Sequence, residues 1–329
     1  MVLRNWSYLV SLVETSRLHS PASFPVFSPH SPYARSISDL SSAVLWAMLG
    51  IFVIVTAMVA YCIRRFRATK AQLTPQPTYG NTRLEVGYTI SFFLILATIM
   101  VFAIRSMNAS DPANSQPDTL VVVAHQWWWG VRYPGTGIVT ANEIHVPVGV
   151  SQRLRLLSAD VIHDFWVPEL GRKMDIIPDV ENHIWFSADA PGTYFGTCAE
   201  FCGVEHAWMR IRVVAQPPAE FAEWQAQQEE VPAIPASGEA ALGAQYFQQL
   251  SCSNCHAIRG TVATASIAPD LTHFASRETL AAGRMTNTAE NLSNWLNDPG
   301  AIKPGCKMPN LHLTAQQRGA LVDYLETLR

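Results

Sequence analysis

Residues 198–209 read Cys198-Ala-Glu-Phe-Cys202-Gly-Val-Glu-His206-Ala-Trp-Met209, and His163 stands upstream in Asp160-Val-Ile-His163. Two thiolates and two imidazoles suit a tetrahedral zinc ion, and two thiols in an oxidising compartment tend to form a disulfide. The thioether of Met209 favours copper instead, because soft sulfur ligands select copper over zinc. With both thiolates bridging, the set has enough donors for two copper ions. Zinc and a plain disulfide stay open as alternatives.

Short β-strands are predicted on both sides of this motif. The runs 119–125, 153–157, 183–186 and 209–214 are apolar or alternate in polarity, and turn signals such as Pro134-Gly135-Thr136-Gly137 separate them. A region of about 100 residues with this pattern predicts a small sandwich or Greek-key barrel.

A second motif, Cys252-Ser-Asn-Cys255-His256, has the spacing for thioether attachment of a c-type haem with the histidine as proximal ligand. A zinc site would need a second cysteine pair, and none follows. The loop Lys303-Pro-Gly-Cys306-Lys-Met308-Pro309 offers Met308 as the sixth ligand. Such Met/His ligation raises the reduction potential and closes the iron to external ligands. Met285 and the thiolate of Cys306 are the alternatives.

The composition predicts a membrane protein. The chain has 329 residues, of which 49% are hydrophobic and only 15% are charged, against about 25% charged in a typical soluble domain. This excludes a disordered chain and an ordinary cytosolic enzyme. The net charge is −3, so nothing indicates a nucleic-acid partner.

Two uncharged runs, at about 40–63 and 86–104, are long enough to cross a bilayer. The loop between them is basic, and by the positive-inside rule it is cytoplasmic; its cations are Arg64, Arg65, Arg67, Lys70 and Arg83. Both termini and the metal motifs are then expected on the periplasmic side of a bacterial plasma membrane. The run 6–13 is a weak signal-peptide candidate. No histidine lies in either span, so a haem or copper held by histidine within the membrane requires another subunit.

The expected fold is therefore that of a multi-domain membrane protein. A two-helix transmembrane hairpin precedes an all-β barrel, and the domain with the haem motif, which follows, resembles an all-α class I cytochrome c. The expected boundaries are an N-terminal segment at 1–37, the hairpin at 38–106, the copper domain at 107–215, a proline-flanked linker at 216–235 and the haem domain at 236–329.

The copper motif, together with His163 and the run His125-Gln-Trp127-Trp-Trp129, closely resembles subunit II of haem–copper cytochrome c oxidases. The resemblance covers residues from about 38 to 215. It implies a cupredoxin barrel with a binuclear, mixed-valence CuA centre. The side-chain ligands so implied are His163, Cys198, Cys202, His206 and Met209, with the backbone carbonyl of Glu200.

The same resemblance assigns three further roles. The carboxylate of Glu200 would bind a magnesium or manganese ion shared with subunit I. Trp127 matches the tryptophan at which electrons enter. Glu85 matches the carboxylate at the mouth of the K proton path, although Val86-Gly-Tyr-Thr-Ile-Ser departs from the Trp and Pro usual there.

The C-terminal region extends the resemblance. The segment Ala268-Pro-Asp-Leu-Thr272, the Met308 loop and an expected final helix at 315–328 look like the cytochrome c domain fused to subunit II in caa3-type oxidases. In that family Pro269 lies against the proximal histidine. Cys306 departs from the polar residue more usual at its position.

The chain is thus interpreted as the subunit of a cytochrome c oxidase at which electrons enter. Electrons from cytochrome c or a quinol:cytochrome c reductase would pass through haem c and CuA to haem a of subunit I. Oxygen is reduced there with proton pumping, and subunit III completes the expected partners. The alternatives are a CuA-bearing subunit of a nitric oxide reductase and a standalone copper-and-haem carrier or copper-delivery protein. The standalone carrier or copper-delivery protein fits less well, because a protein that diffuses freely between its partners needs no membrane spans. A quinol oxidase subunit would lack the copper ligands.

Overall fold

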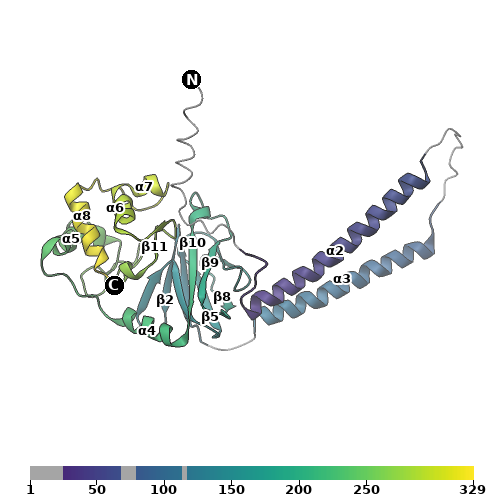
Figure 1. Cartoon of the computed structure of the whole chain (residues 1–329), viewed down its shortest axis with the longest axis horizontal. Coiled ribbons are helices and arrows are strands. Elements are labelled where there is room, and N and C mark those ends of the chain that lie inside the picture. Colours follow the sequence, from purple (N-terminus) through teal and green to yellow (C-terminus); the bar gives the residue numbers. More distant parts are fainter. Residues whose placement is uncertain (1–24, 68–78, 113–116) are drawn as a thin grey trace, which may run out of the picture. The chain divides into compact units, whose positions relative to one another are not determined.

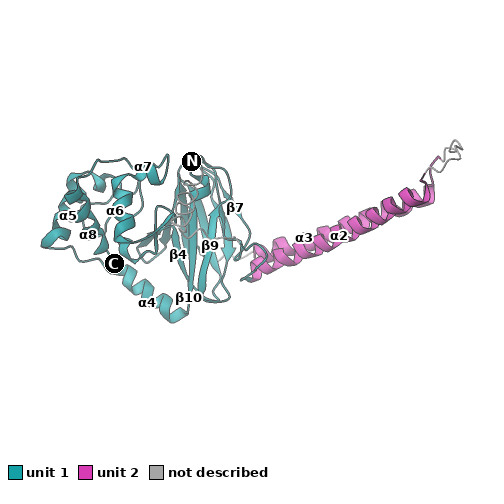
Figure 2. Cartoon of the chain, turned by 45° about the horizontal axis from the view of Figure 1, so that its top comes forward, with its two compact units in different colours: residues 1–31, 115–329 teal, residues 32–114 magenta. Residues whose placement is uncertain are grey.

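A computed structural model describes residues 25–67, 79–112 and 117–329 (Figure 1). The chain divides into two compact units: residues 32–114 form one, and residues 1–31 and 115–329 form the other (Figure 2). The signal-peptide candidate at 6–13 and Lys70 of the basic loop lie outside the described residues.

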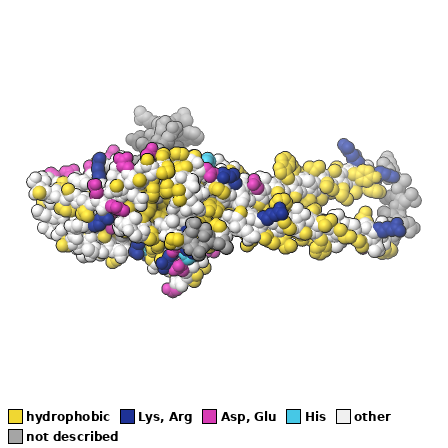
Figure 3. Space-filling model, turned by 90° about the horizontal axis from the view of Figure 1, so that it is seen from below, with side chains coloured by type: hydrophobic (Ala, Val, Ile, Leu, Met, Phe, Trp, Pro, Cys, Tyr) yellow, Lys and Arg dark blue, Asp and Glu magenta, His cyan; other side chains and the backbone are white. Residues whose placement is uncertain are grey.

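The smaller unit is a pair of long apolar helices, α2 (Pro32–Arg65) and α3 (Thr82–Ser110). Their most apolar 18-residue windows have mean hydropathies of 2.5 and 2.2, and no residue of either window is buried within the protein. Hydrophobic side chains cover both helices in Figure 3. Such surfaces favour a lipid environment over water, since exposed apolar area is unfavourable in water. Both expected spans fall within these helices, although α2 begins earlier than the span itself.

The larger unit begins with a barrel of two five-stranded sheets. One sheet has the order β3-β2-β1-β5-β8 and the other β4-β10-β9-β6-β7. The strands are β1 (Leu120–His125), β2 (Trp128–Tyr133), β3 (Ile138–Ala141), β4 (Glu143–Pro147), β5 (Gln152–Ser158), β6 (His163–Trp166), β7 (Met174–Ile176), β8 (Asn182–Phe186), β9 (Gly192–Cys198) and β10 (Arg210–Gln216). Alternate side chains of β1 and β5 are buried, as expected for strands with one face on a core. The four strand regions predicted from the sequence are confirmed.

The segment expected as a linker contains a helix, α4 (Pro218–Glu229), that packs on the barrel. The ring of Trp224 stacks on His145, with centroids 4.2 Å apart and planes 9° apart, and also meets Tyr133. Phe221 and Trp224 both pack against the barrel core. Most of the segment is therefore held in place by aromatic burial.

The haem-motif domain is mainly helical. Its elements are α5 (Gly238–Gln249), η2 (Cys252–Asn254), η3 (Phe274–Ser276), β11 (Thr279–Leu280), β12 (Met285–Thr286), α6 (Ala289–Asn297), α7 (Pro299–Ile302) and α8 (Ala315–Glu326). Helices α5 and α8 pack closely at Gly243, where an added Cβ would lie 1.9 Å from the carbonyl oxygen of Ala320. A capping box of Thr314 and Gln317 starts α8, which confirms the expected final helix.

Candidate metal and haem sites

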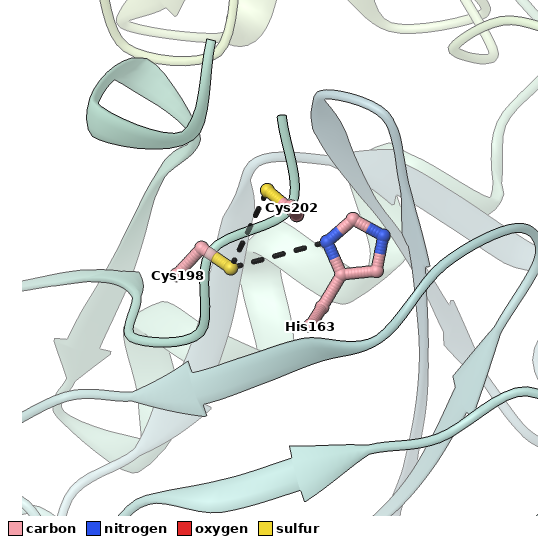
Figure 4. Close-up of side chains that lie close together, drawn as sticks. All are labelled: His163, Cys198 and Cys202. Carbon is pink, nitrogen blue, oxygen red and sulfur yellow. Dashed lines mark hydrogen bonds between the residues drawn. The ribbon is translucent and has the colours of Figure 1, made fainter. Parts of the chain in front are cut away.

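The residues of the copper motif converge at one end of the barrel. The Sγ atom of Cys198 lies 3.9 Å from Nδ1 of His163 and 3.8 Å from Sγ of Cys202 (Figure 4). Sγ of Cys202 is in turn 3.7 Å from Nδ1 of His206 and 3.9 Å from Sδ of Met209. Five side-chain donors thus form one continuous cluster.

Strand pairing brings the two halves of this cluster together. His163 begins β6 and Cys198 ends β9, and these strands pair with Phe165 opposite Cys198. The loop from Cys198 to Met209 closes on itself, because the Cys198 amide donates to the Met209 carbonyl at 3.1 Å. His163, Cys198, Cys202 and Met209 are each at most 3% exposed. The donors are therefore held on a rigid and largely dry scaffold.

The donor spacing fits metal ions better than a disulfide. A disulfide needs sulfur atoms about 2.05 Å apart, and the two Sγ atoms are 3.8 Å apart. Ligands bound to a first-row metal at about 2.0–2.3 Å lie roughly 3.3–3.8 Å from each other in tetrahedral geometry. The carbonyl oxygen of Glu200 also points at the cluster, 3.2 Å from Sγ of Cys198. Two thiolates, two imidazoles, a thioether and a carbonyl suit a pair of copper ions bridged by sulfur.

The pKa values of the two cysteine thiols are shifted in opposite directions. Contact with the Cys202 thiol and with His163 lowers the pKa of Cys198, although burial opposes this shift. The same contact with Cys198, together with burial, raises the pKa of Cys202. Burial lowers the pKa of His163, but its contacts with Cys198 and Asp160 outweigh burial and raise it overall. One thiolate therefore forms readily beside a cation, and the second requires the positive charge of bound metal.

Asp160 is a residue that sequence reasoning missed. Its Oδ1 lies 2.8 Å from Nε2 of His163, and its Oδ2 accepts the Gln126 amide at 2.7 Å. A carboxylate that accepts from the far nitrogen of a ligating histidine fixes the ring and directs Nδ1 to the metal. The signal was a carboxylate three positions before a candidate histidine ligand.

Trp127 lies directly behind the cluster. It is 9% exposed, and its indole N–H donates to the Cys202 carbonyl at 3.0 Å. The side-chain amide of Gln126 donates to the same carbonyl at 2.8 Å. The structure thus brings Trp127 to the site. The Glu200 side chain is exposed. Glu85 belongs to the other unit, in the first turn of α3, where its carboxylate accepts the Asn81 amide.

The haem motif forms a second site. Cys252 and Cys255 are free thiols at the two ends of one turn, in which the Cys255 amide donates to the Cys252 carbonyl. His256 Nδ1 lies 2.7 Å from the carbonyl oxygen of Pro269. Burial lowers the pKa of His256, which keeps the ring neutral. With Nδ1–H bonded to a carbonyl, Nε2 is left as the iron ligand, so the residues fit a covalently attached haem.

The two candidate methionine ligands both pack, partly buried, against the core of this domain. Met285 is part of β12, where it pairs with Leu280. Met308 belongs to the Pro/Gly loop and makes no strand pair. Cys306 is half-buried, and its thiol lies 3.7 Å from the Met308 carbonyl.

A third cluster of possible metal donors is Asp118, Glu181 and His183. Both carboxylates form ion pairs with arginines. The guanidinium of Arg153 lies 2.9 Å from the Asp118 carboxylate, and that of Arg155 lies 2.7 Å from the Glu181 carboxylate. These cations oppose metal binding, so the group is an ion-pair cluster.

Known families match all three parts of the chain. The family model described as cytochrome c oxidase subunit II, transmembrane domain, matches residues 21–106, and the one for its periplasmic domain matches 136–216. The cytochrome c family model matches 240–329. Cytochrome c oxidase subunit 2 of Alkalihalophilus pseudofirmus is 33% identical over 309 residues, which cover 92% of this chain and 90% of the relative. The chain belongs to the cytochrome c oxidase subunit II family.

A second relative agrees with this membership, and one solved structure is similar to part of the chain. Cytochrome c oxidase subunit 2 of Bacillus subtilis is 30% identical over 353 residues, covering 100% of this chain and 99% of the relative. A crystal structure of the periplasmic domain of subunit II (CoxB) of Bradyrhizobium japonicum is 32% identical, with a TM-score of 0.34, and covers 35% of this chain and 96% of that one.

The family membership confirms the expected fold class: two apolar helices, a cupredoxin-like barrel and a fused cytochrome c domain. It makes the chain a component of an oxidoreductase, the haem–copper oxidase, associated with subunit I in the membrane. The two extramembrane domains imply CuA copper and haem c as cofactors.

Proposed function

We propose that this subunit receives electrons from an external donor and passes them, one at a time, to haem a of subunit I, where oxygen is reduced with proton pumping. The observation that carries the proposal is the continuous cluster of His163, Cys198, Cys202, His206 and Met209 in a chain that also bears a haem-attachment motif. The bound haem and copper supply one-electron redox chemistry at low reorganisation cost.

The residues of the barrel hold and shield the copper pair. Cys198 and Cys202 would hold the copper ions through their thiolates and His163 and His206 through their imidazoles, and Met209 and the Glu200 carbonyl would be weaker donors. Asp160 orients His163. Burial of the cluster excludes water, which limits solvent reorganisation when the charge changes. Trp127 carries electrons to this centre through its contact with Cys202.

In the C-terminal domain, Cys252 and Cys255 attach the haem covalently. His256 and Met308 would ligate its iron, and such a Met/His pair raises the reduction potential and closes the iron to external ligands. Pro269 holds the His256 ring through its carbonyl.

Two further roles rest on the family resemblance. The Glu200 carboxylate is exposed and thus accessible to a magnesium or manganese ion shared with subunit I. Glu85, at the exposed start of α3, would stand at the mouth of the K proton path.

We also propose the topology and the partners. Arg64 and Arg65 in the last turn of α2, with Arg83 at the start of α3, support a cytoplasmic loop between the helices. Both termini and the copper (107–215) and haem (236–329) domains would then be periplasmic, on either side of the linker 216–235. A cytochrome c or a quinol:cytochrome c reductase would be the donor, and subunit III a further partner.

Two experiments test this function. Visible and near-infrared spectra of the purified complex, with metal analysis, should show haem c, a mixed-valence copper pair and the haem of subunit I together. The second cuts the chain near Glu230, after α4. The truncated enzyme should keep its copper centre but need far more added soluble cytochrome c, because a bimolecular encounter replaces delivery from a tethered haem. Equal turnover at every donor concentration would remove the fused haem from the electron path.

A further inference from the structure

Basic side chains of the haem domain meet the copper domain around its metal cluster. Arg284 lies 4.3 Å over the ring of Trp208 and 3.8 Å from the Glu205 carboxylate, within the loop of copper ligands. Lys307 lies 3.6 Å from Oδ2 of Asp160. The Lys307 pair is largely exposed and screened by salt, so it stabilises the interface only weakly.

Lys303 makes a contact of a different kind. It is 4% exposed, and its Nζ donates to the backbone carbonyl of Trp127 at 2.6 Å, although 176 positions separate the two residues. Burial lowers the pKa of Lys303 to about 8, opposed by nearby Glu205. A buried ammonium is costly unless its donors find partners. The hydrogen bond to the Trp127 carbonyl therefore offsets part of the cost of burying this ammonium.

The loop that carries Lys303 also packs on Trp127. A Cβ added to Gly305 would lie 2.5 Å from a methyl of Val204 and 3.8 Å from the indole ring of Trp127. Gly305 has φ +86°, a left-handed conformation that favours glycine. Three residues further on is Met308. The segment 303–308 thus connects a candidate iron ligand to Trp127.

A second, separate contact fixes the orientation of the two domains. The carboxylate of Glu143, which is 2% exposed, accepts the backbone amides of Glu278 and Thr279 at 3.0 and 3.1 Å and the Thr279 hydroxyl at 3.1 Å. Arg212 pairs with the Glu278 side chain. The Lys303 contact is separate from this anchor and lies at Trp127 itself.

We propose that Lys303 is a positioning residue for electron transfer between the two domains, holding the 303–308 loop against Trp127 through the Trp127 carbonyl. The proposal rests on the function proposed above. In the step that is positioned, one electron leaves the haem iron, which is oxidised by one electron, and the copper pair is reduced by one. Lys303 neither gains nor loses a proton.

The test compares Lys303→Met with Lys307→Met in the purified oxidase. Methionine nearly preserves the length of the buried side chain but cannot donate, whereas Lys307→Met removes the same charge from an ammonium side chain that is 65% exposed. Hydrogen–deuterium exchange is followed in peptides covering 125–130 and 300–309. The rate of electron transfer from haem c to copper is measured after rapid photoreduction of the haem, with the spectra and potentials of both centres.

We expect Lys303→Met to speed exchange in both segments and to slow transfer, each by about tenfold or more, as for loss of a charge-assisted hydrogen bond. Lys307→Met should change either by less than about twofold. Haem and copper spectra and potentials should stay unchanged in both variants.

Unchanged exchange and transfer in Lys303→Met would overturn the inference, as would a slower rate that simply follows an altered haem potential. Absence of either spectrum from the unmodified enzyme would instead overturn the proposed function. If Lys303→Met fails to incorporate haem, Lys303→Gln serves the same purpose. The glutamine side chain is one bond shorter than that of lysine, so its amide stops short of the Trp127 carbonyl.

Discussion

The indole N–H of Trp127 donates to the backbone carbonyl of Cys202 at 3.0 Å. The side chain proposed to accept electrons is therefore bonded to the backbone of a residue proposed to bridge the copper ions. The carbonyl of Trp127 itself accepts from Lys303, so this one residue contacts both redox domains.

Replacing Trp127 with Phe should slow electron transfer into the copper centre by more than about tenfold while its near-infrared absorption stays intact. Phenylalanine keeps an aromatic ring but loses the hydrogen bond to Cys202, which costs about 1 kcal/mol of stability. Transfer kinetics after photoreduction of haem c would measure this. Trp128→Phe is the matched control, because Trp128 stacks on His125 at 4.1 Å instead. A wild-type rate in Trp127→Phe would refute the assignment.

Cys202→Ser should abolish the mixed-valence copper signal, because a hard hydroxyl replaces a soft bridging thiolate. Met209→Leu should keep both copper ions but change the potential, since a weak ligand tunes the site without building it. Electron paramagnetic resonance and copper content per subunit report both outcomes. A two-copper spectrum surviving in the serine variant would rule out the bridging role.

Asp160→Asn should weaken copper binding by roughly 10–100-fold, the usual effect of losing the carboxylate partner of a ligating histidine. Asparagine keeps the size of the side chain but removes the negative charge of the carboxylate that accepts a hydrogen bond from His163. Competition with a copper chelator measures the affinity. Asp179→Asn changes an exposed acid elsewhere on the barrel and should have no effect. Equal affinities for the two variants would contradict the role given to Asp160.

Met308→Ala should leave the haem covalently attached but lower its potential and open the iron to cyanide or carbon monoxide, because the sixth ligand is lost. Potentiometric titration and ligand-binding spectra would show both changes. Met285→Ala should be nearly silent in these measurements. The reverse pattern would make Met285 the ligand.

Docking of the haem domain should strengthen as pH rises from about 8 to 10. Burial lowers the pKa of Lys303 to about 8 from its usual 10.5, so the docked state binds fewer protons than the undocked state in this window. Raising the pH therefore relieves the cost of burying the ammonium, while the neutral amine, unlike a methionine side chain, still donates to the Trp127 carbonyl. The facing groups are Glu205, Cys306, Arg284 and Cys202. Exchange protection of residues 125–130, corrected for intrinsic rates, should rise with pH in the native enzyme and stay flat in Lys303→Met.

The parts of this structure that were predictable from sequence are those encoded over short distances. The candidate ligands between Cys198 and Met209 lie on one loop, and the haem motif lies on one turn, so spacing alone indicates the chemistry proposed for them. The two membrane helices follow from uninterrupted apolar runs.

The parts that were not predictable depend on contacts between distant segments. Lys303 looked like an ordinary loop lysine, and only the packing of two domains buries it against Trp127. Glu143 gave no signal, because its partners are backbone amides some 135 positions away. The segment 216–235 was expected only as a proline-flanked linker, and the contacts of Phe221 and Trp224 with distant barrel residues are what hold α4 on the barrel.

Because α4 packs on the barrel, the short segment after it limits how far the haem domain can move from the barrel. Only residues 230–237 separate the end of α4 at Glu229 from the start of α5 at Gly238. Eight extended residues span at most about 28 Å, and Pro232 and Pro235 stiffen the segment. Even when undocked, the haem domain would keep the start of α5 within about 28 Å of the end of α4. It therefore cannot travel to collect electrons from a distant complex, and its donor must come to it.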